Sequence, residues 1–187
     1  MDGSQSYPED EILLTGKSLL ELLRGNLCPG YVKDRENILL TAPWEEADFR
    51  VGVYLYDIQD YSPVTVGPSE TGTNSLRFPP KAVELSYMLF CNEKHRFGGV
   101  QREQLQGILN EMIRTVYDNP YLQREDGEKV GFSFLRESVE FKIRLWQSFS
   151  RALQPALYLR ATPILIASGR TRKVHRVKER DYGLEKL

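Results

Sequence analysis

The sequence predicts an α+β fold in which a mixed sheet of about four to five strands is packed with about three helices. Two observations indicate this class. β-Branched and aromatic residues with a period of two concentrate in four segments, residues 50–60, 82–91, 130–135 and 156–167. Leucine-rich or 3.6-periodic segments precede and separate these strands, so helices and strands alternate along the chain as in layered α+β domains.

Length and composition indicate one soluble globular domain. The chain has 187 residues, of which 41% are hydrophobic and 27% are charged, and a chain of this size can bury a core of its own. The net charge is −1, so the whole molecule has no strong attraction to polyanions. The charges are uneven, because residues 1–12 are acidic and residues 169–180 are strongly basic.

The cysteine content and the N-terminus indicate folding in the cytosol. Cys28 and Cys91 are the two cysteines and make no disulfide framework, so both are expected to be free thiols. The N-terminus is acidic and lacks the apolar region of a secretory signal. No stretch approaches the roughly 18 apolar residues of a membrane-spanning helix, so no membrane contact is expected.

The N-terminal part contains one predicted helix. Residues 1–10 are polar, and residues 1–14 are expected to form an N-terminal arm ahead of a main domain at residues 15–168. Thr15 is predicted to cap a short helix that ends at Gly25. Its apolar stripe comprises Leu19, Leu22 and Leu23. Farther along, Ile38–Thr41 is a candidate short strand.

Residues 50–60 are predicted to form the central strand. Val51, Val53 and Leu55 point to one face, and Tyr54, Tyr56 and Ile58 point to the other. Because both faces are apolar, both are expected to be covered. The next segment, Ser62–Pro80, is rich in Gly and Pro and long for a connection in a compact domain. It is expected to be a functional arm or a disordered tip, and a short hairpin around Gly67–Thr73 is a further alternative.

A strand and a long helix follow. In residues 82–91, one face is expected to carry Val83, Leu85, Tyr87 and Leu89, and the other Glu84, Ser86, Met88 and Phe90. A helix opened by Gly98-Gly99 is expected to run to about Asp118 and to stop at Asn119-Pro120. Its buried stripe is expected to comprise Leu105, Ile108, Leu109, Met112 and Val116.

The last third of the chain is predicted to form a strand, a helix, a strand and a tail. Residues 130–135 form the first strand, and Ser138 is expected to cap a helix that runs to about Arg151. Its buried stripe is expected to comprise Val139, Leu145, Trp146 and Phe149. In the last strand, residues 156–167, Pro163 indicates a sheet edge or a bulge. Residues 169–187 are expected to form a basic, extended C-terminal arm.

No motif predicts catalysis or a cofactor. Gly16-Lys17-Ser18 resembles the end of a phosphate-binding loop, but Glu11 stands where that motif needs glycine, so helix capping is preferred. The acidic pairs Glu45-Glu46 and Glu125-Asp126 lie in polar loops, where a solvated surface is expected.

No metal site is predicted either. Cys91 and His95 are close in sequence, but Cys28 and His175 lie far away and lack paired ligand spacing. A buried thiol and a surface histidine are therefore expected, and the chain is expected not to be an enzyme.

The basic C-terminal arm is the candidate binding site. Its candidate contact residues are Arg170, Arg172, Lys173, Val174, Arg176, Val177, Lys178, Arg180 and Tyr182. These residues suit an arm that binds an acidic surface of a partner protein. An extended arm can bind by adding a strand to the edge of the partner's sheet. A solvated chain end is the alternative. Nucleic acid ranks below both, because Tyr182 alone is nearby for base stacking.

The order of the segments resembles a known family. After the leucine-rich helix come Val51-Gly-Val-Tyr-Leu-Tyr-Asp-Ile58, Val83-Glu-Leu-Ser-Tyr-Met-Leu89, Asp118-Asn-Pro-Tyr-Leu122, Leu145-Trp146 and Gln154-Pro-Ala-Leu-Tyr-Leu-Arg-Ala-Thr-Pro-Ile164. In this order, residues 15–168 resemble the cap, or tail-terminator, proteins of phage-tail-like contractile injection systems of the antifeeding-prophage type.

The resemblance implies a tail-terminator-like fold and a structural, non-enzymatic role. It implies a homo-hexameric ring that ends polymerisation of the tail tube and sheath and ties the sheath to the tube. By this analogy, residues 170–182 would bind sheath, and the Ser62–Pro80 loop is a weaker candidate for the ring interface. Assembly is expected in the cytoplasm, with the protein becoming a component of the particle. The alternative function is a small nucleic-acid-binding module that uses the basic tail.

Overall fold

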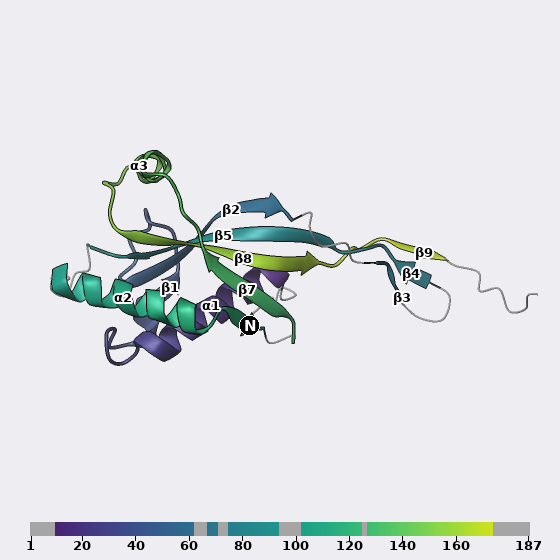
Figure 1. Cartoon of the computed structure of the whole chain (residues 1–187), viewed down its shortest axis with the longest axis horizontal. Helices are drawn as coiled ribbons and strands as arrows, with labels where there is room; N and C mark the ends of the chain where they lie inside the picture. Colours follow the sequence, from purple (N-terminus) through teal and green to yellow (C-terminus); the bar gives the residue numbers. More distant parts are fainter. Residues whose placement is uncertain (1–9, 62–66, 71–74, 94–101, 125–126, 174–187) are drawn as a thin grey trace, which may run out of the picture.

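The computed structural model describes residues 10–61, 67–70, 75–93, 102–124 and 127–173. A six-stranded sheet has the order β1-β2-β5-β8-β7-β6, and helices cover both of its faces (Figure 1). Its strands are β1 Ile38–Leu40, β2 Val51–Asp60, β5 Lys81–Cys91, β6 Tyr121–Gln123, β7 Lys129–Phe134 and β8 Ala156–Ile166. The helices are α1 Glu11–Leu27, α2 Arg102–Asp118 and α3 Val139–Ser148, with a short 3₁₀ turn at Arg35–Asn37.

The α+β prediction is confirmed, and the sheet is mixed. β1 runs parallel to β2, whereas all other neighbours in the sheet are antiparallel. The sheet has six strands rather than four or five because β6 adds an edge strand, in which Leu122 pairs with Val130. A three-residue strand directly after Pro120 has too few residues for a periodic pattern.

The structure places β2 second from the edge of the sheet and not at its centre, which β5 and β8 occupy. β1 pairs only with the first three residues of β2, so the rest of that edge has no strand beside it among the described residues. A bulge between Leu55 and Asp57 places Ile58 opposite Leu85. Ile58 therefore lies on the face opposite to the predicted one, and its side chain is 47% exposed.

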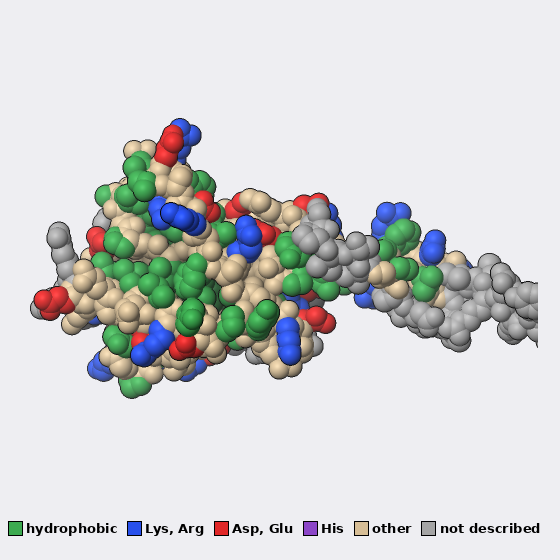
Figure 2. All heavy atoms as spheres, in the orientation of Figure 1, with side chains coloured by type: hydrophobic (Ala, Val, Ile, Leu, Met, Phe, Trp, Pro, Cys, Tyr) green, Lys and Arg blue, Asp and Glu red, His purple; other side chains and the backbone are tan. Residues whose placement is uncertain are grey.

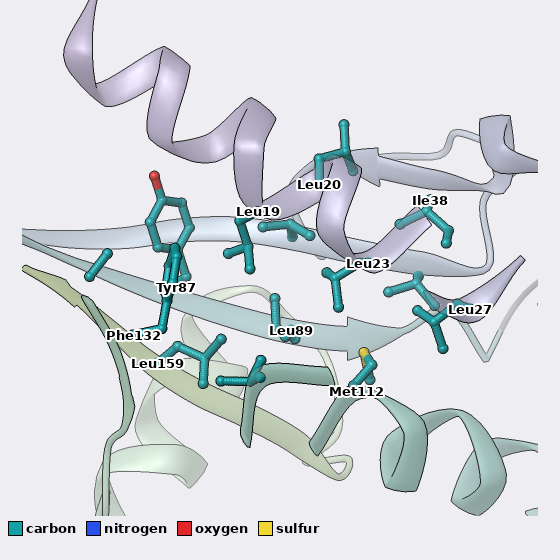
Figure 3. Packing of buried hydrophobic residues seen from close by; sticks show 14 of the residues in the cluster. Leu19, Leu20, Leu23, Leu27, Ile38, Tyr87, Leu89, Met112, Phe132 and Leu159 are labelled. Carbon is teal, nitrogen blue, oxygen red and sulfur yellow. The ribbon is translucent and has the colours of Figure 1, made fainter. Parts of the chain in front are cut away.

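One face of the sheet carries the larger hydrophobic core. Val83, Leu85, Tyr87 and Leu89 of β5 point to this face as predicted, and α1 and α2 cover it (Figure 3). The helices contribute Leu19, Leu20, Leu23, Leu27, Ile108, Met112 and Val116. The predicted stripe of α2 is thus confirmed, and in α1 Leu20 takes the buried position predicted for Leu22.

The opposite face carries a smaller aromatic core. Its buried members are Phe49, Met88, Phe90, Trp146 and Tyr158. The Trp146 indole N–H donates a 3.2 Å hydrogen bond to the Tyr158 hydroxyl, which joins α3 to β8. Figure 1 shows that α3 lies over only part of this face.

The first residues of α1 and α3 can be compared with the two predicted N-cap residues, Thr15 and Ser138. Ser138 caps α3 as expected, because its hydroxyl accepts a 3.1 Å hydrogen bond from Phe141 N. The prediction for Thr15 is wrong: α1 begins at Glu11, inside the stretch assigned to the N-terminal arm. Thr15 is buried in the helix and its hydroxyl donates to Glu11 O at 2.7 Å.

Two further helix predictions are wrong. Gly25 lies within α1, which continues to Leu27, so glycine does not end this helix. Val139 is 66% exposed, because it is the first residue of α3 and lies ahead of the turns that contact the sheet.

The Pro163 prediction is confirmed. Thr162 is the last residue of β8 that pairs with β7, so Pro163 needs no hydrogen bond on that side. Toward β5 the register shifts between Val83 and Leu85, beside Pro163, which is the irregularity that a residue without an N–H favours. Within the described residues, no helix is long and apolar enough to span a bilayer.

Candidate interaction surface

A second, three-stranded sheet projects from the main sheet along the longest axis of the molecule (Figure 1). It consists of β3 Ser69–Glu70, β4 Ser75–Arg77 and β9 Thr171–Lys173, in the order β3-β4-β9. β3 and β4 form the hairpin that was one alternative for the Ser62–Pro80 segment. We call this sheet, together with Phe78 and Arg170, the β-arm.

The β-arm continues the two central strands of the main sheet. At the end of the β5–β8 ladder, Lys81 pairs with Ile166. Beyond Pro79-Pro80, which have no N–H to donate, the same two chain segments pair again. The N–H of Phe78 donates a 2.9 Å hydrogen bond to Arg170 O, and Arg77 lies opposite Thr171. The β-arm is therefore attached to the core through two strands.

The two faces of the β-arm differ. Leu76 lies opposite Arg172, and on the same face the Arg170 guanidinium lies 4.4 Å from the centroid of the Phe78 ring. This distance is within the range of a cation–π contact. The other face carries Arg77 and Lys173. In Figure 2 basic and hydrophobic side chains lie together on this projection.

The β-arm carries more basic than acidic residues. Arg77, Arg170, Arg172 and Lys173 are basic, and Glu70 of β3 is the one acidic residue among the described residues of the β-arm. All of β9 is exposed. Such a surface attracts an acidic partner.

The structure brings together three of the predicted contact residues, Arg170, Arg172 and Lys173, on and beside β9. The other six lie outside the described residues: Val174, Arg176, Val177, Lys178, Arg180 and Tyr182. Sequence analysis missed Leu76, Arg77 and Phe78 as parts of the same surface. A hairpin around Gly67–Thr73 was one of the predicted alternatives. Its pairing with β9 could not be predicted, because the two segments lie far apart in the sequence.

A groove of about 380 Å³ lies between α1 and the exposed edge of β2. It is lined mainly by apolar residues, among them Ile12, Leu13, Leu40 and Trp44. Tyr87 also lines it, although this side chain is only 2% exposed. Among the described residues the Tyr87 hydroxyl has no hydrogen-bond partner, and it lies 3.5 Å from the position of a Cβ on Gly16. Figure 3 shows the hydroxyl on the α1 side of the sheet.

The phosphate-loop resemblance of Gly16-Lys17-Ser18 has no support in the structure, because these residues lie inside α1. The N–H groups inside a helix are already hydrogen-bonded and cannot cradle a phosphate. The segment does not cap the helix either, since Asp10 precedes its first turn.

The remaining sequence candidates do not form a catalytic or metal cluster. Within the described residues, no group of three His, Cys, Asp or Glu side chains has metal-binding geometry. Glu45 accepts hydrogen bonds from the Thr41 hydroxyl at 2.8 Å and from Ala42 N at 3.4 Å. His95, His175 and Glu125-Asp126 lie outside the described residues.

Both cysteines are free, and Cys91 is buried whereas Cys28 is partly exposed. Burial raises the pKa of the Cys91 thiol to about 12 and also raises the pKa of Cys28. A thiol with a raised pKa is a poor nucleophile at neutral pH.

The fold is that of tail terminators. The chain aligns with the sheath/tube terminator, in the extended state, of PVC, an extracellular contractile injection system, with a TM-score of 0.67 and 15% identity over 94% of this chain. It aligns with the tube-terminating cap of the anti-feeding prophage with a TM-score of 0.61 and 15% identity over 89% of this chain. The chain spans 64% and 59% of the lengths of these two proteins.

The chain belongs to the Pvc16 N-terminal domain family, whose model matches residues 15–180. The resemblance drawn from the order of the segments is thus confirmed. Among curated proteins the comparison finds no match.

Proposed function

We propose that this protein is a structural cap of a contractile injection system, which ends the growth of the tail tube and its sheath. The observation that carries the proposal is membership of the Pvc16 N-terminal domain family, together with the likeness of its fold to two terminators. The role requires shape and surface chemistry only, so we propose no catalysis and no cofactor.

The physical task of a cap explains why a folded domain without an active site is sufficient for this role. Tube and sheath grow through head-to-tail contacts that leave a new binding end after each addition. A cap must match that end on one side and present no copy of it on the other. Around the axis, a heterologous contact between copies can close into a ring, and we propose a homo-hexamer as the closed form.

We assign sheath binding to residues 170–182, which begin on the β-arm. The β-arm projects from the core (Figure 1) and exposes basic side chains, so it can reach a neighbouring protein while the core contacts the tube. In this proposal the protein folds in the cytoplasm and becomes a component of the particle there.

Reconstitution with tube and sheath proteins from the same organism tests the proposal. We expect the protein to bind one end of assembled tails as a hexamer of the 21.6 kDa chain and to limit tail length in electron micrographs. Tails of the same length without the protein would contradict it. The competing nucleic-acid function predicts a DNA or RNA complex that weakens steeply with salt, which a gel-shift experiment at low salt detects.

A further inference from the structure

We propose that the groove between α1 and β2 receives the side chain of Tyr121 from a second copy of this chain. In this contact the Tyr87 hydroxyl, at the floor of the groove, hydrogen-bonds to the hydroxyl of Tyr121 of the partner subunit. The inference rests on the proposed homo-hexamer and names the residues of the contact that closes the ring.

The groove combines an apolar lining with one free polar atom. Leu13, Leu40 and Trp44 line it with exposed apolar side chains. The Tyr87 side chain is only 2% exposed, and its hydroxyl, on the α1 side of the sheet (Figure 3), has no hydrogen-bond partner among the described residues. A buried hydroxyl without a partner is unfavourable. The groove therefore suits an apolar side chain that also carries a hydrogen-bonding group.

Tyr121 offers such a side chain at the opposite edge of the sheet. It is the first residue of β6, and β6 and β1 are the two edge strands. Its side chain is 73% exposed, and among the described large hydrophobic side chains only Tyr117 is more exposed. A Cβ at Gly131 would lie 3.5 Å from the Tyr121 ring, so the ring lies across this glycine. Tyrosine combines an apolar ring with a hydroxyl, which are the two properties that the groove requires.

The positions of the groove and of Tyr121 suit a ring. A contact between two different surfaces of neighbouring copies is heterologous, and it can repeat around an axis until the ring closes. The β-arm continues β5 and β8 from the centre of the sheet and occupies neither edge (Figure 1). Copies can therefore meet edge to edge while each β-arm projects away from the contact.

Tyr117 is the competing occupant. It lies on α2, which covers the same face of the sheet as α1. A contact between Tyr117 and the groove beside α1 would join two copies face to face. Tyr121 fits the edge-to-edge contact of a ring better, and Tyr117 provides a matched control of the same residue type and similar exposure.

A double-mutant cycle tests the proposed hydrogen bond. Tyr87→Phe and Tyr121→Phe each remove one hydroxyl and keep the ring. Each should raise the protein concentration at which half of the chains form rings by roughly two- to tenfold, which mass photometry measures. The double variant should assemble no more weakly than either single variant, because both changes delete the same bond. Additive effects, or no effect of either change, would overturn the inference.

Gly16→Ala separates the groove from the stability of the fold. The added methyl group would lie 3.5 Å from the Tyr87 hydroxyl and from Leu40, so it fits and narrows the floor of the groove. Because alanine is the better helix former, the melting temperature should rise while ring assembly weakens at least threefold. Gly25→Ala lies on the same helix, with no atom within 4 Å of the added Cβ. It should raise the melting temperature and leave ring assembly unchanged, and equal assembly by both variants would overturn the inference.

Removal of the whole Tyr121 side chain distinguishes the possible occupants. Tyr121→Ala should keep its melting temperature and assemble at least tenfold more weakly, whereas Tyr117→Ala should assemble normally. Normal rings from Tyr121→Ala would overturn the inference while the cap function stands. Normal rings from Gly16→Ala with weaker binding to tails would assign the groove to the tube and would also overturn it. Unmodified chains that stay monomeric, alone and on tail ends, would overturn the hexamer and the inference together.

Discussion

The guanidinium of Arg170 lies 4.4 Å from the centroid of the Phe78 ring, and Arg170 O accepts a 2.9 Å hydrogen bond from Phe78 N. Phe78 directly precedes the two prolines that interrupt the ladder toward β5, and Arg170 directly precedes β9. These two contacts thus hold the two chain segments of the β-arm together at the point where the β-arm leaves the main sheet. Their energy should decide how well the β-arm is ordered.

Phe78→Ala should loosen the β-arm without unfolding the domain. The cation–π contact contributes about 0.5–1 kcal/mol at an exposed site, and neither residue belongs to the two hydrophobic cores. We expect faster hydrogen exchange at the amides of β4 and β9 with an unchanged melting temperature. Phe78→Tyr, which keeps the ring, is the control. A melting temperature that falls by several degrees would place Phe78 in the cooperative core instead.

Gly52→Ala should destabilise the protein strongly. A Cβ at Gly52 would lie 2.3 Å from Phe90 Cζ, and Phe90 is buried against Phe49 and Trp146, so it cannot move aside freely. Overpacking of this kind lowers the free energy of unfolding by about 1–3 kcal/mol, which urea titration measures.

Gly25→Ala is the matched control for Gly52→Ala. Gly25 lies within α1, and an added Cβ meets no atom within 4 Å. Alanine there should raise the free energy of unfolding by about 0.5–1 kcal/mol. Similar effects of the two substitutions would show that backbone freedom, and not contact with Phe90, dominates at Gly52.

Two buried tyrosines should respond differently to removal of the hydroxyl. Tyr158→Phe leaves the Trp146 indole N–H without its acceptor, which should lower the free energy of unfolding by about 1–3 kcal/mol. Tyr87→Phe removes a hydroxyl that has no hydrogen-bond partner among the described residues. It should be neutral or stabilising by about 1 kcal/mol. A large loss of stability in Tyr87→Phe would reveal a bond to this hydroxyl in solution.

The buried thiol of Cys91 should make the protein less stable at alkaline pH. Burial raises its pKa from 9.0 to about 12, so between these values the unfolded chain loses a proton that the folded chain keeps. The free energy of unfolding is therefore unaffected below pH 9 and falls as the pH rises toward about 12. Cys91→Ala should show a shallower decline above pH 9 in urea titrations. An equally steep decline would assign the effect to other groups, such as Tyr87, whose pKa burial also raises.

Reaction with an alkylating reagent separates the two thiols. At pH 8 the folded protein should react at the partly exposed Cys28 and not at Cys91. Both cysteines should react after unfolding in urea. Labelling of Cys91 at the rate of Cys28 in the folded protein would contradict its burial.

Patterns within single elements could be predicted from the sequence. The alternation along Lys81–Cys91 predicted which residues meet α1 and α2, and Ser138 predicted the start of α3. Both depend on neighbours within a few residues. The predicted N-cap at Thr15 is wrong because packing of a helix against the core decides where the helix begins. Leu14, ahead of Thr15, is already buried.

The position of β2 could not be predicted from its composition. An apolar strand with aromatic residues suits the centre of a sheet, but strand order depends on pairings between distant segments. The bulge after Leu55 also moves Ile58 to the other face, because one extra residue reverses the alternation.

By itself, the sequence determined the fold class, the two-sided strands, the family resemblance and the basic character of the C-terminal segment. Only the tertiary structure joined that segment to the hairpin of the Ser62–Pro80 region, and so made one β-arm from two separate candidates. The physical reason is that composition and periodicity report on local backbone geometry and burial. The pairing of β4 with β9 instead depends on the course of β5 and β8, which bring the two segments side by side.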